Sequence, residues 1–429
     1  MAQRALLGFS LFVLASCASG GEPDTTKPSG KRDGSVDART QDARGDSSGF
    51  RDAGLDTSSS NDGSGTEDAE DMDSAEDTGI EPGDAEADSA PAGDAGPSDA
   101  RSDANPSTDG GALTGEFAVV RVHDGTSSVS TAAAAVFIER RSIATGAVLG
   151  TTPLPTAPSG SKLAFTLSGS GVAEGSLSRS ADGKRLALLG YQSVPGTANV
   201  QGVTDPRVVA VIDAAGTVDT STTLATLYST TSPRAAVIDG TNIWVSGGTS
   251  GIFRTTLGAT TSPASIVTAP SGGRDIAIFS GQLYASTGSV TTGVYQIGTG
   301  LPMFSGGSPA LVVGVPSPYG FAFFDLNSAE AGLDTLYVGD DSAGAGIRVY
   351  TRTSGAWNMT PLLTMGQPVR HIACISAAAD VVCIASSASN LYRVRHIGAA
   401  TQSTQSDVAT IATAPSNTAF RGVALWPVP

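Results

Sequence analysis

The chain has 429 residues, of which 40% are hydrophobic and 15% are charged, and its formal net charge is −16. Residues 1–112 hold 24 of the 41 acidic residues and 8 of the 25 basic ones, so residues 113–429 hold 17 of each. This balance excludes a strongly basic folded part, and it argues against nonspecific electrostatic binding of nucleic acid.

The first residues, MAQRALLGFSLFVLASC, contain one basic residue, Arg4, followed by an apolar core. The core is too short for an ordinary membrane-spanning helix, so the pattern predicts an export signal over residues 1–16. The string LASC at residues 14–17 resembles the lipobox of bacterial lipoproteins. The resemblance implies cleavage before Cys17, acylation of that cysteine and stable membrane anchoring through several acyl chains. A secretory signal with an incidental cysteine is the alternative.

Residues 17–112 begin with the lipidated cysteine and consist mainly of Asp, Ala, Ser and Gly. Such a composition cannot bury enough apolar surface to fold, so we expect a disordered acidic tether. In the enterobacterial lipoprotein pattern, an Asp after the cysteine favours retention in the inner membrane. Ala18 stands there instead. The sequence therefore favours the outer membrane or cell surface of a bacterial envelope over the inner membrane.

Residues 113–429 contain a repeated hairpin pattern. The clearest copy, RAAVIDGTNIWVSGG at residues 234–248, has two apolar runs joined by an Asp-Gly turn, and both of its faces are apolar. The copies begin at Glu174, Arg234, Arg274, Tyr319, Arg370 and Arg421. Spacings of 60, 40, 45, 51 and 51 residues are in the range of propeller blades.

Each hairpin is followed by candidates for a third and a fourth strand. The fourth strands are predicted to start at residues 223, 264, 309, 360 and 408, with sequences TLATLY, ASIVT, PALVV, TPLLT and VATIA. The last blade combines residues 421–427 with strands from residues 116, 134 and about 151, so the N- and C-terminal strands close the ring. The prediction is an all-β, six-bladed β-propeller. A seventh, partial blade within residues 156–173 is the alternative.

The strings EGSLSRSADGKRLALLGY, SPYGFAFFDL with DTLYVGDD, and NTAFRGVALWP resemble an uncharacterised group of exported bacterial β-propeller proteins. More distantly, the repeats are similar to NHL-type and quinoprotein-like propellers. The resemblance covers residues 113–429 and implies fold and export. It implies no activity.

The residues that open the innermost strands are predicted to ring the mouth of the central tunnel. They are Glu174, Arg234, Arg274, Tyr319, Arg370 and Arg421. Several inward-facing guanidinium groups can bind a carboxylate or a phosphate. In the alternative interpretation, each arginine pairs with an acid of a neighbouring blade, such as Asp275 or Glu174, or with loop carbonyl groups.

An arginine cluster with a tyrosine and a glutamate is also similar, in chemistry alone, to the site of six-bladed sialidases. The Asp-box repeat of those enzymes is absent.

Asp340 and Asp341 lie in a Gly-rich loop, where a calcium site is the alternative to an ordinary turn. The three histidines have no metal-ligand spacing, and we expect no other cofactor. The loop from Tyr191 to Arg207 is the best candidate for specificity.

Cys374 and Cys383 flank a hairpin turn between Ala378 and Ala379, so they are expected to face each other across the hairpin with Cα atoms about 4.5 to 5.5 Å apart. Export makes a disulfide the favoured form, and two buried thiols are the alternative.

The function expected from the sequence is a lipid-anchored surface or periplasmic module that binds an unknown protein, glycan or small anionic ligand, or acts as a scaffold. A carbohydrate-active enzyme at the tunnel mouth, sialidase-like or quinoprotein-like, is the competing hypothesis.

Overall fold

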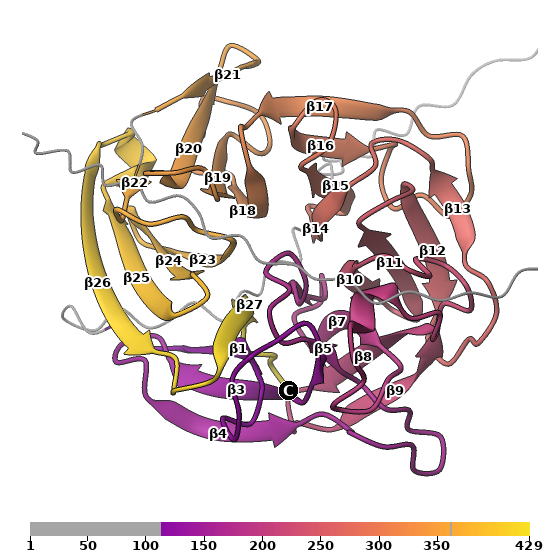
Figure 1. Cartoon of the computed structure of the whole chain (residues 1–429). Helices are drawn as coiled ribbons and strands as arrows, with labels where there is room; N and C mark the ends of the chain where they lie inside the picture. Colours follow the sequence, from indigo (N-terminus) through magenta and orange to yellow (C-terminus); the bar gives the residue numbers. More distant parts are fainter. Residues whose placement is uncertain (1–112, 361–362) are drawn as a thin grey trace, which may run out of the picture. The chain divides into compact units, whose positions relative to one another are not determined.

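The computed structural model describes residues 113–360 and 363–429. The predicted signal, Cys17 and the tether over residues 17–112 lie outside the described residues. Six antiparallel sheets surround one axis, which confirms the six-bladed β-propeller (Figure 1). Residues 156–173 form no seventh blade; β5 (Leu167–Ser168) instead pairs with β2 (Ala133–Ala134) in a two-stranded sheet.

The first three blades have the following strands, each given from the centre outward. Blade 1 contains β27 (Ala419–Leu425), β1 (Glu116–Val122), β3 (Val136–Ser142) and β4 (Val148–Pro153). Blade 2 contains β6 (Leu177–Arg179), β7 (Arg185–Tyr191), β8 (Arg207–Asp213) and β9 (Val218–Thr223). Blade 3 contains β10 (Pro233–Asp239), β11 (Asn242–Gly247), β12 (Ile252–Thr256) and β13 (Ala264–Val267).

The remaining blades follow the same order. Blade 4 contains β14 (Gly273–Phe279), β15 (Gln282–Thr287), β16 (Gly293–Ile297) and β17 (Pro309–Gly314). Blade 5 contains β18 (Pro318–Phe324), β19 (Thr335–Asp340), β20 (Gly346–Thr353) and β21 (Ala356–Met359), and β22 (Leu363–Thr364) also pairs with β20. Blade 6 contains β23 (His371–Ala377), β24 (Asp380–Ser386), β25 (Asn390–Ile397) and β26 (Gln405–Thr413). Two short 3-10 helices, η1 (Val200–Gly202) and η2 (Ala399–Thr401), lie in loops.

The inner strands are apolar on both faces because each blade packs between two others. All seven residues of β18 are buried, and the cluster around Phe321 and Phe323 includes Tyr284 of the preceding blade. The rings of Tyr284 and Phe323 lie 4.5 Å apart. Such clusters between neighbouring blades form the core and fix the position of each inner strand.

Two predicted outer strands were wrong. The fourth strand of blade 2 is β9, over residues 218–223, and residues 224–228 form turns instead. In blade 5 the outer edge is divided between β21 and β22, so the single strand predicted from residue 360 does not form; residues 361–362 lie outside the described part.

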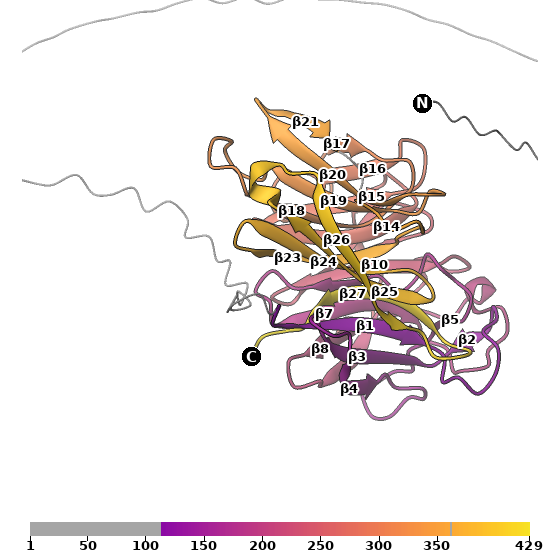
Figure 2. The same cartoon turned by 90° about the vertical axis from the view of Figure 1, so that its left-hand side faces the viewer.

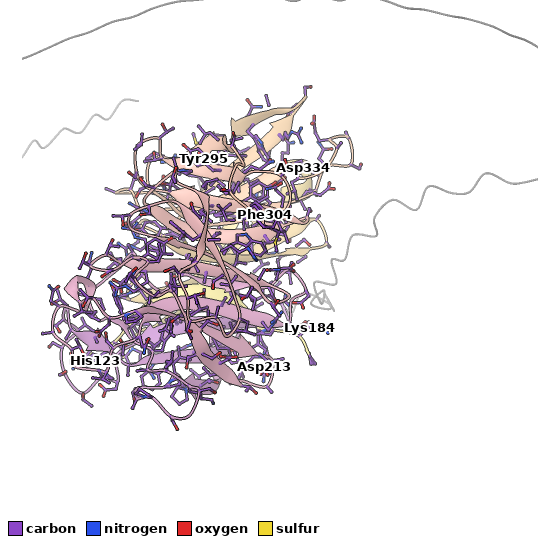
Figure 3. The ribbon with its side chains drawn as sticks, turned by 90° about the vertical axis from the view of Figure 1, so that its right-hand side faces the viewer. His123, Lys184, Asp213, Tyr295, Phe304 and Asp334 are labelled. Carbon is purple, nitrogen blue, oxygen red and sulfur yellow. A yellow bond between two sulfur atoms is a disulfide. The ribbon has the colours of Figure 1, made fainter. Side chains whose placement is uncertain are left out.

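The propeller has two distinct faces. Every inner strand begins on one face, here called the mouth face, where the loops between second and third strands also lie. Figure 3 shows the faces in profile, with His123 on the mouth side and Lys184, Asp213 and Asp334 on the other. Glu116 and the C-terminal Pro429 lie on the face opposite the mouth, and Figure 2 shows the C-terminus on the side away from β2 and β5.

Candidate functional site

Three of the predicted mouth residues, Arg234, Arg274 and Tyr319, are the second residues of their inner strands. Arg370 stands just before β23, Arg421 is the third residue of β27, and Glu174 stands three residues before β6. The second strands help to hold the start of the inner strands. Ser286, at the end of β15, donates a hydrogen bond of 2.7 Å to the carbonyl group of Tyr319 in the next blade. Ser386, at the corresponding place in β24, donates one of 2.7 Å to the carbonyl group of Arg421. The repeated serine therefore fixes the backbone at the start of the following inner strand.

Tyr319 lies beneath two of the arginines. Its ring is buried, the guanidinium carbon of Arg274 lies 4.2 Å from the ring centroid, and that of Arg370 lies 6.0 Å away. Arg370 also forms an ion pair with Asp341, with Nη2 and Oδ1 3.0 Å apart. The structure thus brings Arg274, Tyr319 and Arg370 together at the mouth, and cation–π contacts hold the two charges near one ring.

Arg421 and Glu174 are buried and engaged with the protein. Arg421 donates hydrogen bonds to the carbonyl groups of Gly169, Gly171 and Phe420, and burial lowers its pKa to about 10. The carboxylate of Glu174 accepts a hydrogen bond of 2.5 Å from the Tyr191 hydroxyl and one from the Ser168 N–H. Burial raises the pKa of Glu174. Arg421 therefore fits the alternative in which an arginine binds loop carbonyl groups.

Arg234 and Arg274 differ from the other two arginines. Each is half-buried and donates one hydrogen bond to a neutral oxygen: Arg234 to the carbonyl group of Gly273 at 3.3 Å, and Arg274 to the Ser317 hydroxyl at 3.0 Å. Neither has an acidic group within ion-pair distance among the described residues. Burial, followed by the charge of Arg274, lowers the pKa of Arg234. These two cations are neighbours, and the carboxylates that act on them, Glu174 on Arg234 and Asp341 on Arg274, do so from beyond ion-pair distance.

Buried polar atoms without a partner gather at the mouth. In the part of the chain that the structure describes, ten buried side-chain nitrogen and oxygen atoms have no hydrogen-bond partner. Five of the ten are the Nε atoms of Arg234, Arg274 and Arg370 and both ring nitrogens of His371. Unsatisfied buried groups are rare in native proteins, and their concentration at one place indicates a site for an external polar group.

His371 is the mouth residue that sequence reasoning missed. It follows Arg370, is 2% exposed, and its ring meets that of Tyr319 edge to face at 5.8 Å. Burial lowers its pKa to about 3, and the charges of Arg370 and Arg421 act in the same direction. The neutral imidazole therefore offers one donor and one acceptor. The other two histidines have partners: His123 accepts a hydrogen bond from Gly125, and His396 contacts the Tyr337 hydroxyl at 2.7 Å.

Asp340 and Asp341 are both bound to arginines. Asp340 is buried, accepts hydrogen bonds from Ser342 and forms an ion pair with Arg348, which lowers its pKa despite its burial. Asp341 pairs with Arg370. The calcium site stays a prediction, and a calcium ion there would compete with two guanidinium groups. No group of three or more His, Cys, Asp or Glu side chains within the described ranges could hold a metal ion.

The floor of the mouth is formed by a contact across the ring. Ser176, just before β6, donates a hydrogen bond of 2.5 Å to Asp275 of β14, two blades away. Ser178 donates one of 2.8 Å to the carbonyl group of Ile276. Because these bonds join strands that are not neighbours, protein atoms bridge the ring below the mouth.

Tyr191 and Arg207, at the two ends of the loop predicted to give specificity, lie beside Glu174. The guanidinium carbon of Arg207 lies 4.6 Å from the Tyr191 ring centroid, and both residues are fully buried. Burial raises the pKa of Tyr191. Glu174 is thus hydrogen-bonded to Tyr191, whereas Tyr319 packs against Arg274. The tyrosine next to Glu174 is therefore the fully buried Tyr191 and not Tyr319, the tyrosine of the predicted ring.

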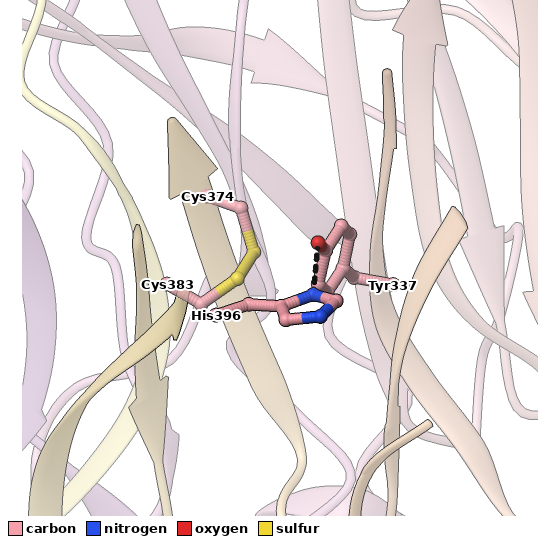
Figure 4. The surroundings of a disulfide bond; sticks show 4 residues. All are labelled: Tyr337, Cys374, Cys383 and His396. Carbon is pink, nitrogen blue, oxygen red and sulfur yellow. Dashed lines mark hydrogen bonds between the residues drawn. A yellow bond between two sulfur atoms is a disulfide. The ribbon is translucent and has the colours of Figure 1, made fainter. Parts of the chain in front are cut away.

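Cys374 and Cys383 form a disulfide between β23 and β24 (Figure 4). The two residues are direct partners in the strand register, as the hairpin predicted. Their Cα atoms lie 4.0 Å apart, which is closer than expected. Cys383 is buried in the core of blade 6, so the bond lies away from the mouth residues.

A separate cavity of about 430 Å³ opens on the face opposite the mouth. It is lined by the start of β1, the side chains of Arg140 and Arg179, and the C-terminal residues 425–429. Arg140 is paired with Glu116 there at 2.5 Å and lies over the Trp426 ring.

Within residues 113–360 and 363–429, no helical segment has the length and apolar character needed to span a membrane.

No protein-family model matches the chain, and no curated protein sequence is similar to it. Among solved structures, the chain is similar to TolB from Acinetobacter baumannii, with a TM-score of 0.44, 11% identity, and coverage of 73% of this chain and 67% of that one. A chain of the nidogen/laminin complex gives a TM-score of 0.45, 12% identity, and coverage of 72% and 98%. The Pseudomonas aeruginosa periplasmic gluconolactonase PpgL gives a TM-score of 0.36, 14% identity, and coverage of 70% and 83%.

Proposed function

We propose that this propeller is a binding module whose mouth holds an anionic ligand, a carboxylate or a phosphate, on Arg234 and Arg274. The observation that carries the proposal is that these two half-buried guanidinium groups are neighbours and form no ion pair with an acidic group among the described residues. Leaving a charge partly desolvated and unpaired is costly. A bound anion would remove that cost and supply acceptors for the free Nε–H groups.

The other mouth residues support the site without being its main ligands. Arg370 is neutralised by Asp341, and Arg421 is held by carbonyl groups beside Glu174. His371 supplies a neutral donor or acceptor next to Arg370. A carbohydrate-active enzyme is the competing hypothesis, and its tyrosine and carboxylate would have to be residues other than the buried Tyr191–Glu174 pair.

The test is calorimetric titration of the full chain with inorganic phosphate and with acetate. Replacing Arg234 and Arg274 by Gln should abolish binding while changing the melting temperature little. Gly288→Ala is a subtler variant, because a Cβ there would lie 2.2 Å from Arg274 Nε and would push the flexible guanidinium aside. We expect it to lower affinity about tenfold, the value of one charge-assisted hydrogen bond.

Gly150→Ala is the matched control, because a Cβ at Gly150 on β4 meets nothing within 4 Å. Its affinity should equal that of the wild type. The proposal fails if the wild type binds neither anion and the double arginine variant is strongly destabilised, since the arginines would then serve the fold alone.

Membrane anchoring is a second part of the proposal and rests on the lipobox at residues 14–17. Leu113 and Glu116 precede and open β1, whose start lies on the face opposite the mouth. Cys17→Ser should move the protein from the membrane fraction to the soluble fraction, or leave its signal uncleaved. Normal processing with unchanged membrane association would exclude lipid anchoring at Cys17.

A further inference from the structure

The loop between β15 and β16, residues 288–292, stands directly over one of the two unpaired cations. Gly288 lies so close to Arg274 that a Cβ there would require the flexible guanidinium group to move. The base of the loop is fixed, because Gly288 donates a backbone hydrogen bond of 3.1 Å to Gly272, and the Thr287 hydroxyl donates to Ser271. The loop is therefore held in place immediately before the strand that carries Arg274.

The tip of this loop presents an apolar side chain to solvent. Val290 is 97% exposed, the highest value among the exposed large apolar residues that the structure describes. Its φ is +61°, a left-handed conformation that is rare and strained for a β-branched residue. The loop thus holds an exposed valine in an unfavourable backbone conformation, two residues beyond the glycine that meets Arg274, and strained backbone of this kind clusters at positions that contact a ligand.

Three further mouth loops carry exposed valines. Val172 is 38% exposed and follows Gly171, whose carbonyl group accepts a hydrogen bond from Arg421. Val194 is 50% exposed and begins the loop after Tyr191. Single exposed apolar residues are ordinary on a protein surface. Here four exposed valines stand in loops of the mouth face, since Val129, 37% exposed, lies in the loop after β1.

We infer that the ligand is an amphipathic anion: an anionic group that carries a short apolar substituent. The inference rests on the proposed function and names the class of ligand for that site. The anionic group binds Arg234 and Arg274, and the substituent packs against Val290, which stands two residues beyond the glycine that covers Arg274. The charge of the arginines fits the head group, and the apolar rim fits the substituent.

The experiment compares inorganic phosphate with hexyl phosphate, and acetate with hexanoate, by calorimetric titration of the full chain. Hexyl phosphate and hexanoate should each bind about five- to tenfold more tightly than the short counterpart, because part of the alkyl chain leaves water. Val290→Ser should remove most of this gain and leave the affinity for inorganic phosphate unchanged. Val148→Ser is the matched control, since Val148 is an exposed valine, 49% accessible, on the outer strand β4.

Two results would overturn the inference while leaving the anion site intact. Inorganic phosphate and hexyl phosphate could bind equally well, or Val148→Ser could lower hexyl phosphate affinity as much as Val290→Ser. If none of the four anions binds the wild type, both the anion site and this inference fail. The two phosphate and two carboxylate arms also show which head group the arginines prefer.

Discussion

Asp275 is a buried carboxyl group at the floor of the mouth, where it accepts a hydrogen bond from Ser176 across the ring. Burial raises its pKa from the ordinary value of 3.8 to about 7, although hydrogen bonds from Ser176 and from the backbone of Ile276 and Phe321 favour the charged form. The contact that bridges the ring therefore involves a carboxyl group that titrates close to neutral pH.

This shift predicts how stability depends on pH. The folded state binds the Asp275 proton more tightly than the unfolded state, so the stabilisation is fully present below about pH 4 and is lost as pH rises through about 7. Asp275→Asn keeps the hydrogen-bond acceptor and does not titrate. Between pH 4 and pH 8 the wild type should lose up to about 4 kcal/mol of unfolding free energy relative to the variant. Urea unfolding of the wild type and of Asp275→Asn at a series of pH values measures this difference in free energy. Parallel pH profiles for the two proteins would contradict the prediction.

At the same scale, the sequence predicted which residues open the inner strands but not their partners. Five of the six residues lie within two residues of the start of an inner strand, because the copies of the hairpin repeat begin at nearly the same place in each blade, whereas Glu174 lies three residues before β6. The partners come from loops or from other blades: Asp341 reaches Arg370, and Tyr191 reaches Glu174. Such contacts depend on the conformation of the loops, which the repeat pattern in the sequence does not predict.

Among the strands, inner and middle ones were predictable and two outer ones were not. Inner strands are apolar on both faces, which is a strong signal. In β9, with the sequence VDTSTT, the buried side chains include Thr220 and Thr222, which form hydrogen bonds to Leu163 and Gly258. Buried threonines conceal the alternation of apolar and polar residues. The more apolar Leu224 and Tyr228 nearby lie in turns, where Tyr228 has a φ of +61°.

The disulfide joins the two strands of one hairpin, β23 and β24, over a sequence separation of nine residues. A loop this short should stabilise the fold by about 2 to 3 kcal/mol in the chain-entropy account. Replacing both cysteines by Ser should lower the melting temperature by on the order of 5 °C. A reductant should lower the wild type to the same value and leave the variant unaffected. A wild-type melting temperature that does not respond to reductant would count against this role.

In the whole molecule, the ring is closed by β27, which pairs with β1 and packs against β6 of the next blade. Gly422 of β27 donates a backbone hydrogen bond of 2.9 Å to Gly175. A Cβ at Gly422 would lie 2.3 Å from the Gly175 oxygen and 2.3 Å from the Leu177 nitrogen. These are backbone atoms, which cannot move aside as the end of a side chain can.

Gly422→Ala should therefore force blades 1 and 2 apart. We expect the free energy of unfolding to fall by about 1 to 3 kcal/mol, the usual effect of overpacking. Proteolysis should also become faster at the seam, the contact between β27 of blade 1 and β6 of blade 2. Thermal unfolding and limited proteolysis measure both effects, with Gly150→Ala as a control that meets no neighbour. A melting temperature equal to that of the control would mean that the seam can relax.

The pairing of Phe117 with Leu425 also determines when the propeller can be completed. These residues stand at opposite ends of the folded sequence, so their contact is among the least local in the chain. During synthesis, which proceeds from the N-terminal end, β1 lacks its inner neighbour until the last strand emerges. For that interval blade 1 has an unpaired strand edge. This edge can pair with another chain until β27 covers it.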